Sequence, residues 1–105
     1  MLALPDIDRV VHEAASAVYG QGTISRVSSK PIADPYGDDA LGVSIVFARG
    51  QFDKIDPDAA LDALHNIQRS LRKVGEDRFA VVDYATEEEL EEEALLEASG
   101  DHDES

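Results

Sequence analysis

The stretch from Leu41 to Tyr84 constrains the fold more than any other part of this 105-residue chain. It contains a strand-like run (LGVSIVFA), a helical run (DPDAALDALHNIQRSLRKVG) and a second strand-like run (FAVVDY). In the first run, large apolar residues alternate with mostly small ones, which indicates a central strand. A strand, a helix and a strand in this order almost always form a right-handed crossover, so the two strands are predicted to be parallel.

The helix in this stretch is predicted over residues 56–74. Asp56 lies at the expected N-cap, Pro57 at the first helical position, and Gly75 supplies the left-handed residue that ends the helix. The predicted buried stripe comprises Leu61, Leu64, Ile67, Leu71 and Val74. Acidic residues near the start and basic residues near the end complement the helix dipole.

A first amphipathic helix is predicted from Asp6 to Tyr19, with Asp6 as a cap and Gly20 as the stop. Its wet face is predicted to carry Asp8, Arg9, His12, Glu13 and Ser16. Thr23–Ser29 is rich in β-branched residues and is interpreted as an edge strand, although Ile24 and Val27 break the alternation. Pro31 is predicted to end this strand, and residues 31–40 are predicted to form a loop.

The predicted fold class is α+β: a two-layer α-β-β-α-β sandwich with a three-stranded sheet and an acidic C-terminal helix or tail. Residues 1–85 form the single domain, residues 86–98 a short acidic helix, and residues 99–105 a disordered tail. The acidic helix has a capping box, with Thr86 at the N-cap and Glu89 three residues later.

Charge is distributed very unevenly along the chain. The net charge is −14; residues 1–85 carry nine basic and thirteen acidic residues, whereas residues 86–105 carry ten acidic residues and neither Lys nor Arg. Such a surface repels nucleic-acid phosphates and anionic lipids and attracts basic proteins. We therefore expect no nucleic-acid or membrane partner.

The residues give little support for catalysis or for a cofactor. The chain has no cysteine, and its serines lie outside the motifs of known nucleophiles. His12, His65 and His102 show no metal-ligand spacing and are interpreted as surface or boundary residues. We expect a non-enzymatic protein without catalytic residues, cofactor or metal. The alternative of a small-ligand or divalent-metal site rests on the loop from Asp34 to Asp39.

The acidic end is the strongest functional feature. The expected function is a non-enzymatic interaction protein that binds a basic protein partner, with an antitoxin or nuclease inhibitor as the sharpest version. The predicted partner-binding residues are Glu87, Glu88, Leu90, Glu91, Glu92 and Leu95. A second alternative is an assembly module that forms a homodimer through its sheet, by the edge at Thr23–Ser29. Lack of cysteine and of a signal-peptide pattern favours the cytoplasm, and the composition resembles small acidic bacterial accessory proteins in general.

Overall fold

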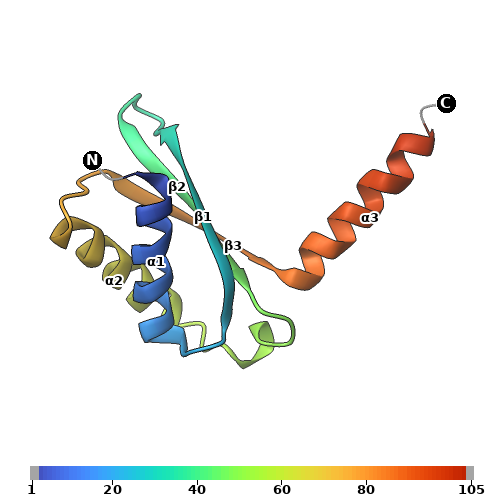
Figure 1. The fold of residues 1–105 in the computed structure, drawn as a ribbon, viewed down its shortest axis with the longest axis horizontal. Coiled ribbons are helices and arrows are strands. Elements are labelled where there is room, and N and C mark those ends of the chain that lie inside the picture. The colour runs from blue at the N-terminus through green and yellow to red at the C-terminus, as the bar shows by residue number, and fades with distance from the viewer. Residues whose placement is uncertain (1–2, 104–105) are drawn as a thin grey trace.

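A computed structural model describes residues 3–103, with the side chains of residues 3–97. The elements in chain order are α1 (Leu4–Tyr19), β1 (Ile24–Ala33), β2 (Asp39–Phe47), the short 3-10 helix η1 (Phe52–Lys54), α2 (Ala59–Lys73), β3 (Phe79–Thr86) and α3 (Glu87–Asp103). Figure 1 shows α1, α2 and the sheet as one body and α3 as a separate projection.

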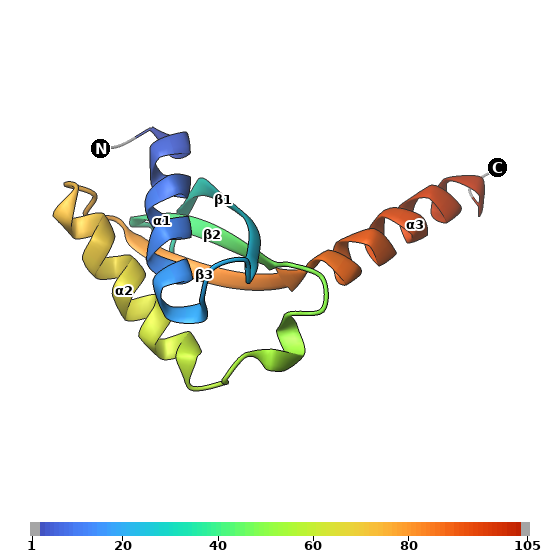
Figure 2. The ribbon, with the colours of Figure 1, turned by 60° about the horizontal axis from the view of Figure 1, so that its bottom comes forward.

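The sheet has the strand order β1-β2-β3, with β1 antiparallel and β3 parallel to the central strand β2. Leu41 lies beside Ala80, and Val43 lies beside Val82. Both α1 and α2 cover the same face of the sheet (Figure 2), and α1 packs between β1 and α2. The predicted α+β sandwich and its parallel crossover are confirmed, and β1 and β2 form an antiparallel hairpin.

The first strand is longer than predicted, because β1 continues through Pro31 to Ala33. An edge strand tolerates proline where the missing N–H would have pointed away from the sheet. The alternation that seemed broken is repaired by a bulge between Ile24 and Arg26. This extra residue brings Ile24 and Val27 to the same, helix-covered face.

The core lies between the helices and the sheet face made by Leu41, Val43, Ile45 and Phe47. The helix residues that complete it are Ile7, Val11, Ala14, Ala15, Ile67 and Leu71. Their burial accounts for most of the driving force for folding, because apolar area removed from water is the dominant favourable contribution.

The buried stripe of α2 is rotated relative to the prediction. Ala63, Ile67 and Leu71 are buried, whereas Leu61 and Val74 are 59% and 45% exposed. The rotation follows from where α1 packs, since the Asn66 amide donates to the carbonyl of Ala14 at 2.8 Å. The prediction that Leu61 and Val74 belong to the core is therefore wrong.

The helix starts also differ from the predicted ones. Helix α1 begins at Leu4 after Ala3, and Asp6 lies in the first turn, where it pairs with Arg9 rather than capping the helix. Helix α2 begins at Ala59, because the Asp56 carboxylate accepts the Asp58 N–H at 3.0 Å and holds a turn before the helix.

One residue of the predicted wet face of α1 is instead covered. Ser16 is only 7% exposed, and its Oγ lies 3.5 Å from the Nδ1 of His12. The small hydroxyl side chain fits the boundary of the core, where the wider apolar stripe of α1 meets its polar face.

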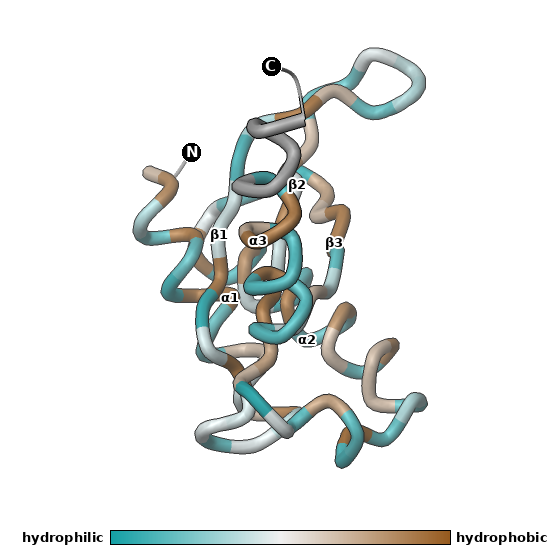
Figure 3. The backbone as a smooth tube through the Cα atoms, turned by 90° about the vertical axis from the view of Figure 1, so that its right-hand side faces the viewer, coloured by the Kyte–Doolittle hydropathy of each residue, from teal (hydrophilic) through white to brown (hydrophobic). Residues whose placement is uncertain are grey.

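Helix α3 extends beyond the predicted end at Ala98 and reaches Asp103. Residues 99–103 of the predicted tail are thus helical, and residues 104–105 lie outside the described residues. Its Ala, Leu and Glu content favours helix strongly. Hydrophilic and hydrophobic residues lie side by side along α3 (Figure 3), so it offers no single apolar face for packing on the body.

Candidate protein-binding surface

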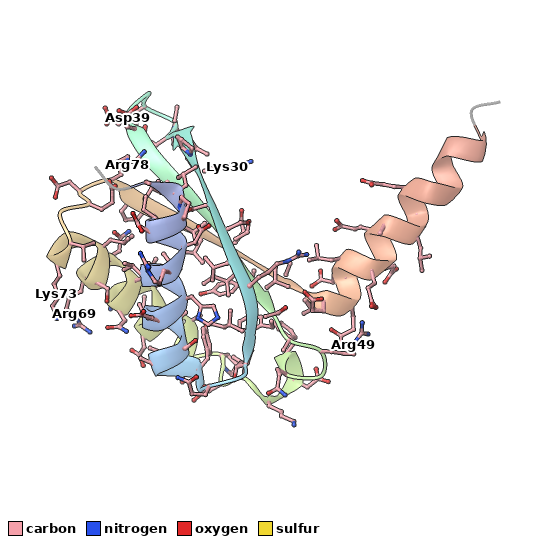
Figure 4. All side chains as sticks on the ribbon, viewed as in Figure 1. Lys30, Asp39, Arg49, Arg69, Lys73 and Arg78 are labelled. Atoms are coloured by element: carbon pink, nitrogen blue, oxygen red, sulfur yellow. The ribbon has the colours of Figure 1, made fainter. Side chains whose placement is uncertain are left out.

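The first turns of α3 are fastened to the body by three of the predicted partner-binding residues. Glu87 accepts a hydrogen bond from the Ser25 hydroxyl at 3.1 Å. Glu88 accepts the N–H of Gly50 at 3.0 Å. Glu91 forms an ion pair with Arg49. Figure 4 shows Arg49 at the base of α3. These contacts orient the helix. They also occupy three carboxylates that were predicted to bind a partner.

The start of α3 is reinforced by the predicted capping box. The Thr86 Oγ1 accepts the N–H of Glu89 at 3.0 Å, and the Glu89 carboxylate accepts the N–H of Thr86 at 3.1 Å. Two otherwise unpaired N–H groups at the helix terminus are thereby satisfied. The direction in which α3 leaves the sheet is consequently set by hydrogen bonds rather than by apolar packing.

The charges at this junction stabilise one another. The hydrogen bond to Glu91, with the charge of that residue, raises the pKa of the Arg49 guanidinium. Hydrogen bonds from its own backbone N–H and from that of Gly50, with the positive charge of Arg49, lower the pKa of Glu88. Both groups are exposed, so screening by solvent keeps these interactions modest. They direct the helix more than they stabilise the fold.

The remaining predicted residues lie further out on α3. Leu90 is half-buried, whereas Glu92 is exposed and Leu95 is 69% exposed. Among the described side chains, those of Glu92, Glu93 and Glu97 form no hydrogen bond or ion pair with the body. The part of α3 that is open to a partner therefore begins after Glu91.

Next to the base of α3 lies an apolar pocket of about 330 Å³ that the sequence did not predict. Its lining includes four of the six aromatic residues of the chain: Tyr19, Phe47, Phe52 and Tyr84. Phe47 stacks on Tyr84 with ring centres 5.5 Å apart, and Tyr19 meets Phe47 edge-on at 5.2 Å. We call these four residues the aromatic pocket. Phe52, at 55% exposure, is the most exposed of the four.

The polar groups of the aromatic pocket are turned toward each other. The Tyr19 hydroxyl donates to the Tyr84 hydroxyl at 3.3 Å. Burial, together with this hydrogen bond, raises the pKa of Tyr19 above its ordinary value. The phenol therefore stays neutral at physiological pH. An apolar lining with paired, neutral hydroxyls suits an apolar side chain or ligand group.

The topology explains why these aromatic residues meet. Phe47 ends β2 and Tyr84 lies near the end of β3. Because these strands are parallel, their carboxyl ends lie at the same edge of the sheet. The short helix η1, which follows β2, adds Phe52, and the end of α1 adds Tyr19. The only sequence signal was the aromatic residue at the end of each strand, and it becomes informative only once the parallel register is known.

The loop from Asp34 to Asp39 is a turn held by its own first carboxylate. The Asp34 Oδ1 accepts the N–H groups of Tyr36 and Asp38 at 2.8 and 2.9 Å. Across the described residues, no three His, Cys, Asp or Glu side chains are grouped in a way that could hold a metal ion. The ligand-site alternative for this loop stays a prediction.

No protein-family model matches the chain, and no curated protein matches it. Within residues 3–103, no helix combines the length and the apolar character that a membrane crossing needs.

Proposed function

We propose that this protein is a non-enzymatic acidic interaction protein that binds a basic protein partner through α3 and the aromatic pocket. The observation that carries the proposal is their adjacency: Tyr84 lines the pocket, and α3 starts at Glu87, three residues later. Residues 83–93 contain seven carboxylates and no cationic side chain. An apolar cavity and a dense negative charge thus share one side of the molecule.

The two parts supply different contributions to binding. Aromatic pockets provide the desolvated centre at which interfaces concentrate their binding energy. Carboxylates around such a centre steer a basic partner and increase its association rate. The sharpest version of the proposal is an antitoxin or nuclease inhibitor, because a row of carboxylates can occupy a site built for phosphates. The absence of cysteine supports a cytoplasmic setting for this role.

The test uses the full chain as immobilised bait in a lysate of the source cells, followed by purification of the captured protein and measurement of its Kd. The first variant is Glu92→Gln/Glu93→Gln/Glu97→Gln, which neutralises exposed carboxylates of α3 that do not contact the body. The matched control is Glu13→Gln/Asp38→Asn/Asp77→Asn, which changes the charge equally at exposed positions elsewhere.

The expected partner has a basic isoelectric point and binds the control variant normally. It binds the α3 variant about 3- to 150-fold more weakly, for about 0.2–1 kcal/mol at each of the three exposed charges, and its affinity falls as salt increases. A Phe52→Ala variant tests the pocket in the same assay. Equal affinity for the α3 variant and the control, or insensitivity to salt, would contradict the proposal.

Two alternatives from the sequence remain proposals. The loop from Asp34 to Asp39 as a divalent-metal site would be abandoned if Ca²⁺ and Mg²⁺ left the melting temperature unchanged. The homodimer through the sheet, by the edge at Thr23–Ser29, would be abandoned if sedimentation equilibrium showed a monomer at high protein concentration.

A further inference from the structure

The lining around the aromatic pocket contains a single charged residue, Asp56, which is exposed in the connection between η1 and α2. Among the described residues that line the pocket, none is a lysine or an arginine. The rest of the lining is apolar and includes Ile55, Pro57 and Ala60. This combination of apolar surface, aromatic rings and one negative charge is complementary to a side chain that is apolar along its length and positive at its end.

The carboxylate of Asp56 is available to such a group. Its Oδ1 accepts the N–H of Asp58 at 3.0 Å. Within residues 3–97, no ion pair joins Asp56 to a cationic side chain. Lys54 is exposed and lines a neighbouring cavity instead, and Arg49 pairs with Glu91. A cation that enters the pocket therefore meets a carboxylate that it does not have to take from another partner.

An anion does not fit the pocket, although α2 begins beside it. Backbone N–H groups at the start of a helix commonly bind anions. Here the N–H of Asp58 is bonded to the side chain of Asp56. The N–H groups of Ala59 and Ala60 are bonded to backbone carbonyls, and Pro57 has no N–H. The first turn thus leaves no donor for an anionic ligand, and the carboxylate of Asp56 repels one.

Two rings of the aromatic pocket are open to a cation. Phe52 is 55% exposed and Tyr84 is 38% exposed, whereas Phe47 is buried. A cation over the face of an exposed ring is attracted by the negative charge of its π-system. Tyr84 also lies three residues before the acidic start of α3, so the surrounding carboxylates attract the same cation.

We propose that the aromatic pocket receives an arginine side chain of the basic partner. The methylene stem lies against the apolar lining, while the guanidinium stacks on an exposed ring and pairs with Asp56. Arginine suits this site better than lysine, because its planar guanidinium is weakly hydrated, stacks on rings and binds a carboxylate through two N–H groups. A pocket of about 330 Å³ is small for a ligand site and matches one long side chain. This inference rests on the proposed function and identifies the group of the partner that enters the pocket.

The test is a nuclear magnetic resonance titration of the full chain with N-acetyl-arginine methylamide and with its citrulline analogue, which has nearly the same shape and no charge. The arginine compound should bind about 4- to 25-fold more tightly, because an exposed carboxylate and an aromatic face each contribute about two- to fivefold. Its side-chain protons should also be shifted by the nearby rings. Equal affinity for the two compounds, absence of binding by both, or tighter binding of the norleucine analogue would overturn the inference.

Three variants locate the preference for arginine. Asp56→Asn removes the charge but keeps the turn, because asparagine accepts the N–H of Asp58 in the same way, and it should reduce the preference about two- to fivefold. Asp58→Asn changes an adjacent exposed carboxylate outside the lining and should leave the preference unchanged. Phe52→Leu keeps an apolar side chain without the ring and should reduce the preference about two- to fivefold. A preference that survives both Asp56→Asn and Phe52→Leu would contradict the proposed site.

The captured partner separates this inference from the proposed function. If the α3 variant weakens the binding of the partner and Asp56→Asn does not, the proposed function stands and the arginine inference fails. If the α3 variant binds like its control while the arginine compound is still preferred over citrulline, the pocket binds an arginine side chain and only the proposed function fails.

Discussion

The carboxylate of Glu76 holds the guanidinium of Arg78 at two points. The Arg78 Nε lies 2.9 Å from one carboxylate oxygen and Nη2 lies 3.1 Å from the other. The Glu76 side chain is only 2% exposed, and the Arg78 side chain is 12% exposed. The same carboxylate also accepts the N–H of Arg78 at 3.1 Å. This pair closes the connection between α2 and β3 and fixes where β3 begins. The hydrogen bond to Glu76 is the main reason that the pKa of Arg78 is raised.

Replacing Arg78 by alanine should lower the free energy of unfolding by about 3 kcal/mol, because it leaves the buried Glu76 carboxylate without its guanidinium. The control is Arg69→Ala, since Arg69 is exposed and donates only to Asn66 at 2.7 Å on the same helix. That change should cost less than about 0.5 kcal/mol. Urea denaturation of the three proteins checks the difference. Equal midpoints for the two variants would show that the pair does not stabilise the fold.

The face of α2 that packs on the core can be tested with two leucines. Leu71 is fully buried, whereas Leu61 is 59% exposed. Leu71→Ala should cost about 2–5 kcal/mol through lost burial and the cavity left behind. Leu61→Ala should cost less than about 1 kcal/mol in the monomer. Thermal unfolding at a low protein concentration, where any dimer is dissociated, measures both. Similar decreases in stability for the two variants would mean that Leu61 is part of the core, as the sequence pattern predicted.

The sequence predicted the sandwich because its elements carry strong local signals. The strand around Val43, the helical run between Pro57 and Gly75 and the capping box at Thr86 each depend on nearby residues. The predicted burial of Leu61 was wrong because helical periodicity does not show which part of an apolar stripe packs on a neighbouring helix. The packing of α1 determines which face of α2 is buried, and this long-range contact cannot be predicted from a local sequence pattern. The strand after Thr23 was predicted too short because proline was expected to end it, whereas an edge strand tolerates Pro31.

The candidate surface was predictable only in part. Its charge is visible in the sequence, but the attachment of Glu88 and Glu91 depends on the position of the loop at Arg49 and Gly50. The aromatic pocket joins Tyr19 and Tyr84, which are 65 residues apart. Only the parallel register of β2 and β3 and the packing of α1 bring such distant residues together.

The raised pKa of Tyr19 predicts a loss of stability in alkaline solution. In the unfolded chain this phenol ionises near its ordinary pKa of 10.0, whereas in the folded chain it stays protonated to higher pH. The unfolded state therefore releases the proton first, so the stabilisation is complete below pH 10 and decreases as pH rises above it. Tyr19→Phe should show a shallower decrease between about pH 9.5 and 11 than the wild type. Denaturation midpoints across this range measure it, and parallel curves would contradict the assignment.

The orientation of α3 should depend on Arg49 and on acid pH. Because the chain has no cysteine, Ser44→Cys and Glu97→Cys can be spin-labelled specifically, one on the open face of the sheet and one on α3. In this background Arg49→Ala removes the ion pair with Glu91 and should broaden the distribution of label distances. Arg26→Ala, an exposed cation on β1, serves as the control and should leave the distribution narrow.

Acid should have a similar effect on the same pair of labels. The pKa of Glu88 is lowered below its ordinary value of 4.5, so its contribution to the attachment is complete above that pH and is lost as pH falls through the lower, folded-state value. The distance distribution should therefore be narrow at pH 7 and broaden in acid, as pH falls below 4.5 and through the lowered pKa of Glu88. The Arg49→Ala variant should give a broad distribution at both pH values. Distributions that are equally narrow in all three proteins and at both pH values would mean that the capping box at Thr86 alone orients α3. The carboxylates of its first turns would then be free to bind a partner.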